Sequence, residues 1–180
     1  MIIHLNGMPG VGKLTVAKIL AADLPARLID NHRLIDTVTV CCDRGSLMYI
    51  ETLLKLTKVV YEVLETLQKK EIFVFTNALS AELSEDRERF NAVQTLADRR
   101  GVPFVPTLLT CTLEENKQRL VDPARASKGK LMDIENLASL YEKYTIYHPT
   151  THHNAIVINT TGLKPAQVAD RIAQHIKDIQ

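Results

Sequence analysis

The chain has 180 residues, of which 46% are hydrophobic, and this size predicts a single domain, residues 1–180, with its own hydrophobic core. Lys and Arg number 22 against 21 Asp and Glu, so the net charge of +1 excludes a broad basic surface for nucleic acid. No segment approaches the roughly 18 consecutive apolar residues of a membrane span, and we expect a cytoplasmic protein without a membrane partner.

In the first half of the chain, short apolar runs alternate with segments of helical periodicity. The apolar runs predict strands at residues 1–6, 26–30 and 71–79. Apolar residues that recur at helical spacing predict helices at residues 12–24 and 46–70. The longer helix contains neither Gly nor Pro, and the shorter one ends before Pro25.

The second half of the chain continues this alternation. Helices are predicted at residues 84–100, 113–120, 134–147 and 166–179. Strands are predicted at residues 102–111 and 155–159, and residues 121–130 form a short polar segment. Apolar strands that alternate with helices predict an α/β fold, in which helices cover both faces of a parallel sheet and functional sites lie at the carboxyl ends of the strands.

A phosphate-binding motif lies between the first strand and the first helix. Gly7, four further residues, Gly12 and Lys13 match the Walker A pattern G-x-x-x-x-G-K. Glycines let the backbone curl so that successive N–H groups point at phosphate oxygens, and the positive end of the following helix adds favourable charge. The alternative is a glycine turn that merely joins strand to helix. The motif predicts nucleotide contacts from Gly7, Pro9, Gly10, Val11, Gly12, Lys13, Leu14 and Thr15.

The residue after the lysine departs from the motif. A Ser or Thr normally stands there and offers its hydroxyl to Mg²⁺, whereas the side chain of Leu14 has no metal-binding atom. Thr15 lies about 100° further round the helix, so we expect its hydroxyl near the α-phosphate instead. Mg²⁺ retains water readily and is often held mainly by substrate phosphates. The loop is therefore compatible with a magnesium site built from waters and phosphates, without a direct Ser or Thr ligand.

The loop sequence GMPGVGKLT, residues 7–15, resembles the G-x-P-G-x-G-K-x-T form of the P-loop small-molecule and nucleotide kinases, such as adenylate kinase, shikimate kinase and gluconate kinase. Residues 108–120 are similar to the family's fourth strand and the arginine-bearing helix after it, and residues 156–172 to its last strand, turn and helix. The resemblance implies a three-layer α/β/α fold with a five-stranded parallel sheet of order 2-3-1-4-5. It also implies ATP as the phosphate donor and Mg²⁺ as the metal.

The same resemblance implies roles for two arginines. Arg119 would lie against the adenine or the phosphates, and Arg125, on a short lid over about residues 121–131, would approach the transferring group. Cationic donors of this kind stabilise the charge that develops during phosphoryl transfer. For each arginine the alternative is a solvated helix end. The turn at residues 161–163 could meet the adenine edge through its backbone, or it could be a plain connection.

Asp30 ends the second predicted strand, beside the loop. Related kinases often have a carboxylate there that serves the acceptor hydroxyl, or Mg²⁺ through water, and the alternative is an N-cap for a helix beginning near His32. After the third strand, the family commonly carries an acidic residue, a glycine cluster or a Gly-x-Pro-Arg turn, whereas residues 75–83 (FTNALSAEL) offer hydrogen bonds but no metal-binding carboxylate and no arginine for an acceptor phosphate. Without that arginine, a nucleoside monophosphate is a poor candidate for the acceptor.

The leading hypothesis is an ATP-dependent kinase, of the EC 2.7 type, that acts on a small-molecule acceptor. Lys13, Asp30 and Arg125 would be its catalytic residues. A nucleotide-binding switch or sensor with little transferase activity is the competing hypothesis, because Leu14 weakens the metal site. An NTP hydrolase is a third, for which the sequence nominates no residue that orients water. Neither the acceptor nor the oligomeric state follows from the sequence.

Overall fold

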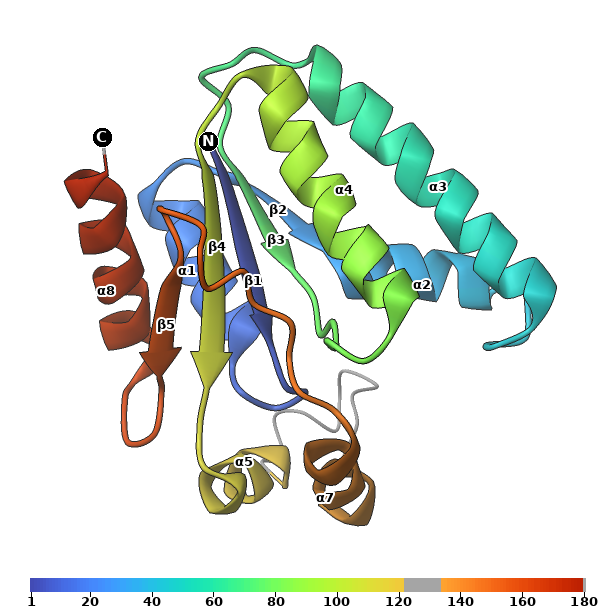
Figure 1. The fold of residues 1–180 in the computed structure, drawn as a ribbon, viewed down its shortest axis with the longest axis vertical. Coiled ribbons are helices and arrows are strands. Elements are labelled where there is room, and N and C mark those ends of the chain that lie inside the picture. Colours follow the sequence, from blue (N-terminus) through green and yellow to red (C-terminus); the bar gives the residue numbers. More distant parts are fainter. Residues whose placement is uncertain (122–133, 180) are drawn as a thin grey trace.

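In the computed structural model, residues 1–121 and 134–179 are described. Parallel strands form a five-stranded sheet in the order β2-β3-β1-β4-β5 (Figure 1). The strands are β1 (Ile2–Gly7), β2 (Arg27–Asp30), β3 (Phe73–Thr76), β4 (Phe104–Thr110) and β5 (Ile156–Asn159). The predicted α/β class, parallel pairing and strand order are therefore confirmed.

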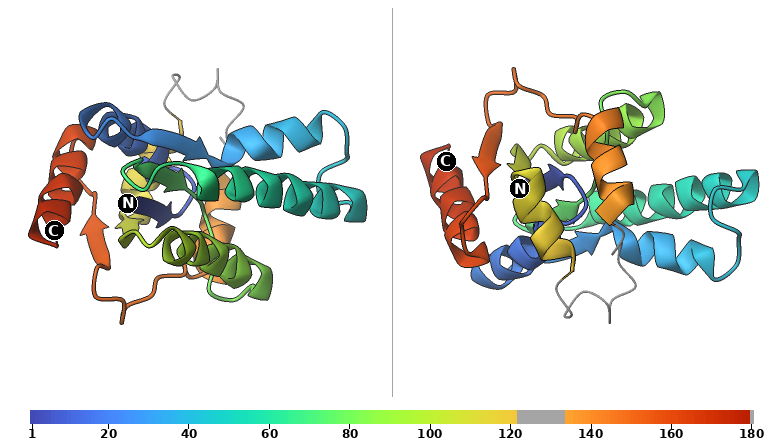
Figure 2. Two further views of the ribbon diagram at one scale, coloured as in Figure 1. Left: turned by 90° about the horizontal axis from the view of Figure 1, so that it is seen from above. Right: turned by 90° about the horizontal axis from the view of Figure 1, so that it is seen from below.

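Helices cover both faces of the sheet, and further helices lie beyond the carboxyl ends of the strands (Figures 1 and 2). They are α1 (Lys13–Asp23), α2 (Asn31–Thr39), α3 (Leu47–Thr66), α4 (Ser84–Arg100), α5 (Leu113–Leu120), α7 (Ile134–Lys143) and α8 (Pro165–Asp178). Helices α1 and α8 pack on one face, and α3 and α4 pack on the other. In the part of the chain that the structure describes, no helix is both long and apolar enough to cross a membrane.

The central strand β1 contributes to the core on both faces. Ile3 and Leu5 pack toward α1 and α8, whereas Ile2 packs toward α3 and α4. Successive side chains of a strand point to opposite faces, so a strand that is covered on both sides must be apolar throughout. This explains why the first residues of the chain form a continuous apolar run rather than an alternating pattern.

The predicted helices at residues 46–70 and 134–147 end earlier than their periodicity indicates. Helix α3 ends at Thr66 instead of residue 70, because the backbone becomes extended at Leu67. The guanidinium of Arg100 donates to the carbonyls that follow, those of Leu67 at 3.0 Å and Gln68 at 2.8 Å. Helix α7 ends at Lys143 instead of residue 147, because the chain beyond it pairs with the segment after β3. Tertiary hydrogen bonds thus override local propensity at both ends.

Besides Asn6, the buried strand β1 contains a second polar side chain, that of His4. It is fully buried, and its ring lies among Phe75, Phe90 and Phe104, with the closest ring centroid, that of Phe90, at 4.8 Å. Its Nε2 lies 2.9 Å from Oδ1 of Asn77, and because a carbonyl oxygen can only accept, Nε2 is the donor. Burial lowers the pKa of His4 to about 4, against the partial compensation of the Asn77 bond. The imidazole is therefore neutral at physiological pH.

This burial predicts a pH-dependent stability. Because the pKa is about 4 in the folded chain and 6.5 in the unfolded chain, the contribution is fully present above pH 6.5 and is lost as the pH falls toward 4. Over that window the loss is on the order of 3 kcal/mol. Urea unfolding at pH 7.0, 5.5 and 4.5 measures it against His4→Gln, which retains a neutral donor for Asn77. We expect the pH dependence of the free energy of unfolding to be flatter in the variant, and parallel curves would contradict the assignment.

Candidate functional site

The loop between β1 and α1 lies at the carboxyl edge of the sheet (Figure 1). Gly10 and Gly12 adopt φ angles of +98° and +102°, a left-handed backbone that residues with a Cβ rarely adopt. Helix α1 begins at Lys13, and among the described residues no side chain caps its N-terminus. By contrast, Ser46 and Thr112 cap α3 and α5. The positive end of the α1 dipole thus meets no side-chain cap among the described residues, and such an end favours an anion.

The ammonium group of Lys13 lies across this loop. Its Nζ donates to the carbonyl oxygen of Gly7 at 2.7 Å and to that of Met8 at 2.9 Å. A lysine is a flexible point charge with several donors, so a polyanion in the loop can replace these carbonyls as its partner. The geometry therefore places a cation at the mouth of the loop, as the motif predicts.

Helix α5 supports the loop from behind through Asn116, a fully buried residue. Its Nδ2 donates to the carbonyl of Pro9 at 2.9 Å and to the hydroxyl of Tyr141 in α7 at 2.9 Å. The contact is close, because a Cβ built on Gly10 would lie 2.0 Å from Oδ1 of Asn116. Burial raises the pKa of Tyr141 to about 12, which keeps the phenol protonated at neutral pH. Gly10 is thus required both by its φ angle and by the side chain behind it.

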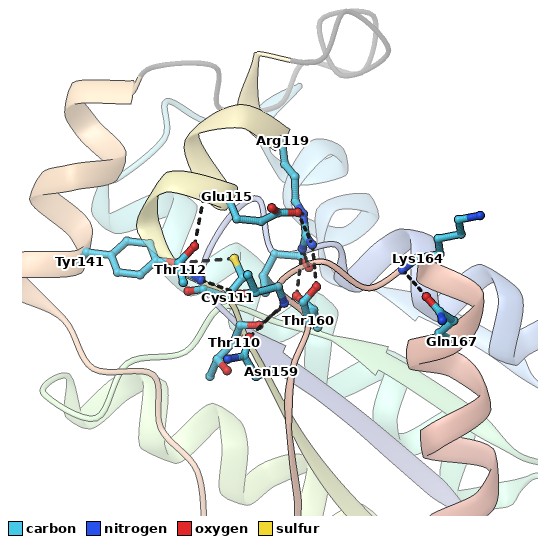
Figure 3. A network of polar contacts seen from close by, with 12 residues as sticks. Thr110, Cys111, Thr112, Glu115, Arg119, Tyr141, Asn159, Thr160, Lys164 and Gln167 are labelled. Atoms are coloured by element: carbon cyan, nitrogen blue, oxygen red, sulfur yellow. Dashed lines mark hydrogen bonds and ion pairs between the residues drawn. The ribbon is translucent and has the colours of Figure 1, made fainter.

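Arg119 joins the loop to helix α5 and to the turn after β5 (Figure 3). Its guanidinium donates to the carbonyl of Val11 at 3.1 Å, to Oγ1 of Thr160 at 2.9 Å and to the carbonyl of Thr160 at 2.8 Å. It also forms an ion pair with Glu115 at 2.8 Å. The solvated helix end that the sequence left as an alternative is therefore wrong for this residue. The N–H groups along the edge of the guanidinium bond to the protein, so its flat faces are the surfaces on which a ligand would stack.

Asp30 lies at the carboxyl end of β2 and is buried. Its Oδ1 accepts from the amide of His32 at 3.2 Å and from the hydroxyl of Thr76 at 3.0 Å. The carboxylate is thus the N-cap of α2, one of the two interpretations that the sequence left open. Both of these bonds use the same oxygen. A role for Oδ2 in chemistry is compatible with this geometry and remains a prediction.

The residues beside Lys13 offer little to a metal. Leu14 is half-buried, and Thr15 is exposed. In residues 1–121 and 134–179, no group of three or more His, Cys, Asp and Glu side chains is arranged to hold a metal ion. Arg125 and nearly all of the predicted lid fall outside the described residues.

A cavity of about 990 Å³ opens between α3 and α4, beyond the ends of β2 and β3. Asn31 and Asn77, which directly follow those strands, line its inner end. Neither this cavity nor the contacts of Asn116 and Thr160 were predicted from the sequence. The available signal for Asn116 was a polar residue on the inward side of α5, and the cavity has no local signal because it depends on the separation of two helices.

Comparisons with known proteins identify the fold. No protein-family model and no curated protein matches the sequence. Solved structures do match, among them a candidate kinase from Chloroflexus aurantiacus, with a TM-score of 0.69, 14% identity and coverage of 97% of both chains. A gluconokinase from Sinorhizobium meliloti has a TM-score of 0.62 and 14% identity, over 98% of this chain and 91% of that one. The APS kinase of Mycobacterium tuberculosis, in complex with AMPPNP and APS, has a TM-score of 0.59 and 16% identity, over 98% and 96%. The fold is that of the P-loop small-molecule kinases.

The packing of Gly10 against Asn116 predicts a difference between two glycines. Gly10 and Gly45 have similar φ angles of +98° and +87°, but a Cβ at Gly45 would meet nothing within 4 Å. Gly45→Ala should therefore lower the free energy of unfolding only by the strain of a left-handed backbone, roughly 1–2 kcal/mol. Gly10→Ala should cost about 1–3 kcal/mol more, because the new methyl group overlaps Asn116.

Urea unfolding of both variants measures this difference. Adding Asn116→Ala to Gly10→Ala removes the overlap, so the two changes together should cost less than their sum. Equal losses for Gly10→Ala and Gly45→Ala would show that Asn116 does not restrict the loop.

Proposed function

We propose that this chain is a kinase that binds ATP at the β1–α1 loop and transfers the γ-phosphate to a small-molecule acceptor. The observation that carries the proposal is the uncapped N-terminus of α1, with the ammonium of Lys13 held above the loop by two carbonyls. Such an arrangement suits a polyphosphate. The P-loop kinase fold supports it, as does the bound AMPPNP of the M. tuberculosis APS kinase.

The protein would bind the nucleotide mainly through its phosphates. Amides of residues 10–14 would donate to phosphate oxygens, Lys13 would exchange the carbonyls of Gly7 and Met8 for the β- and γ-phosphates, and Thr15 would lie near the α-phosphate. The adenine would stack on a flat face of Arg119, because the guanidinium edge already bonds to Val11, Glu115 and Thr160. Arg125, outside the described residues, would approach the transferring phosphate.

The residues present fit a magnesium ion that is bound chiefly by the nucleotide. Leu14 removes the usual direct ligand, and Asp30, at the carboxyl end of β2 and separated from β1 by β3, would hold a metal-bound water. When bound, Mg²⁺ would neutralise charge on the β- and γ-phosphate oxygens.

The acceptor would enter from the side of β2 and β3. Its hydroxyl oxygen would bond to the γ-phosphorus, the bond from that phosphorus to the β–γ bridging oxygen would break, and ADP would leave. The hydroxyl proton would pass to the carboxylate of Asp30, which is buried at the carboxyl end of β2. A nucleotide-binding switch without transfer is the second candidate, because Leu14 leaves the metal with fewer protein ligands.

Lys13→Met tests nucleotide binding. Loss of the charged donor should weaken ATP binding about 10- to 100-fold, the worth of a charge-assisted hydrogen bond. Calorimetric titration with ATP measures the affinity. Lys18→Met, on the exposed side of the same helix, is the matched control and should bind ATP as the unchanged protein does. Equal affinities for Lys13→Met and the unchanged protein would remove the lysine from the site.

Asp30→Asn separates a chemical role from the capping role. The amide oxygen can still accept from His32 and Thr76, so stability should change little, whereas loss of the base should slow ADP formation about 100-fold or more. Asp30→Ala removes the cap as well and should cost about 1 kcal/mol of stability. The measurements are ADP release with a mixed panel of hydroxyl compounds and urea unfolding. A tight ATP complex whose ADP release stays at background with every compound would favour the switch over the kinase.

A further inference from the structure

The cavity between α3 and α4 is lined by both buried and exposed apolar side chains. Tyr49, Leu53 and Leu96 are buried at its base, and Ile50 and Leu54 are 47% and 55% exposed along its side. Helices α3 and α4 meet near the end of α3, where Leu64 joins the core beneath the sheet, and α3 with α2 extends beyond the sheet (Figure 2). The apolar side chains of α3 thus face a space that the protein itself does not fill.

The inner end of this cavity is polar and adjoins the proposed transfer site. Asn77 follows β3, and its backbone N–H donates to the carbonyl of Leu5 in β1 at 3.0 Å, two residues before the phosphate-binding loop begins. The side-chain Oδ1 of Asn77 accepts from His4. Asn31 follows Asp30 at the end of β2. Amide side chains can donate to and accept from a hydroxyl group without carrying charge. A hydroxyl at this end would lie beside the carboxylate that we propose as its base.

The charged residues around the cavity balance one another. Arg44, Lys58, Arg89 and Arg99 line it together with Glu62, Glu65, Glu85 and Glu88. Lys58 pairs with Glu62 at 3.9 Å, Arg99 pairs with Glu65 at 3.6 Å, and Arg89 pairs with Asp86 at 3.8 Å. An acceptor that carries a carboxylate or phosphate needs a surplus of cationic donors, often a bidentate arginine. The lining supplies no surplus of positive charge.

From these features we infer that the acceptor is an uncharged amphipathic molecule, with a hydroxyl-bearing head at Asn31 and Asn77 and an apolar body along Leu53, Leu54 and Leu96. The inference rests on the proposed transfer reaction for the role of that hydroxyl. The volume of about 990 Å³ accommodates a ligand of several hundred daltons, at the upper end of the usual range for small-molecule pockets. Burial of the apolar body would supply binding energy at a distance from the reacting atoms.

Two variants on α3 separate the cavity from the rest of the helix. Leu54 and Val59 are both 55% exposed, but Leu54 lines the cavity and Val59 does not. A carboxylate at either position is partly solvated and should leave the fold intact. Leu54→Asp places a charge against the apolar body of the ligand, whereas Val59→Asp does not.

The experiment uses the uncharged fluorophore N-phenyl-1-naphthylamine and competes it with octyl glucoside, below its critical micelle concentration, and with glucose, gluconate and AMP. We expect saturable binding of the fluorophore, displacement by octyl glucoside alone, and a loss of at least about tenfold in fluorophore affinity for Leu54→Asp. Val59→Asp should bind the fluorophore as the unchanged protein does. Octyl glucoside should also raise ADP release above the level with glucose.

Several results would overturn the inference. Displacement by gluconate or AMP as effective as that by octyl glucoside would indicate a polar or anionic acceptor, and equal losses in Leu54→Asp and Val59→Asp would indicate binding outside the cavity. A parallel titration with ATP distinguishes the two proposals. If ATP binds and gluconate raises ADP release, the kinase stands and the inferred acceptor class is wrong. If octyl glucoside displaces the fluorophore but ATP does not bind, the ligand class stands and the kinase is wrong.

Discussion

The site depends on the N-terminus of α1, which no side chain caps in the part of the chain that the structure describes. A helix N-terminus is ordinarily satisfied by a side chain, as Ser46 and Thr112 do for α3 and α5. At Lys13 the loop instead curls through Gly10 and Gly12 and leaves this end without a side-chain cap. Such a loop has to be supported from outside, because main-chain hydrogen bonds alone do not fix its shape.

That support comes from helices later in the chain. Asn116 bonds to the carbonyl of Pro9, and Arg119 bonds to that of Val11, so α5 contacts the loop on both sides of Gly10. Arg119 also bonds to Thr160 after β5, and Asn116 bonds to Tyr141 in α7. A network of several polar contacts of this kind favours one geometry in a low-dielectric interior. The loop is therefore positioned by contacts more than a hundred residues distant in sequence, before any ligand binds.

Parallel strand order brings the remaining parts together. Because β3 lies between β2 and β1, the carboxyl ends of these strands place Asp30, Asn77 and Gly7 along one edge of the sheet. The phosphate-binding loop occupies one part of this edge, and the cavity between α3 and α4 opens at another. This is the usual location of ligands in open α/β sheets. Donor and acceptor sites of the proposed reaction are thus adjacent by topology alone.

Local sequence features predicted most of the fold and only the first part of the site. The apolar runs located the strands, and Ser84–Arg100 and Leu113–Leu120 form helices with the predicted ends, because periodicity and Gly101 are local signals. The early end of α3 at Thr66 was missed, because it depends on Arg100, which lies more than thirty residues away. The capping role of Asp30 stayed open in the sequence, because it shows only in the bond that Oδ1 accepts from the amide of His32, while the role as a base remains a prediction. The cavity had no signal in the sequence.

A crystal structure of the protein with AMPPNP and Mg²⁺ would test the central claim most directly. The account predicts the β-phosphate within hydrogen-bonding distance of the amides of residues 10–14, with Nζ of Lys13 moved from the carbonyls of Gly7 and Met8 to phosphate oxygens. A nucleotide bound elsewhere, or a Lys13 that keeps both carbonyls while the nucleotide is bound, would contradict it.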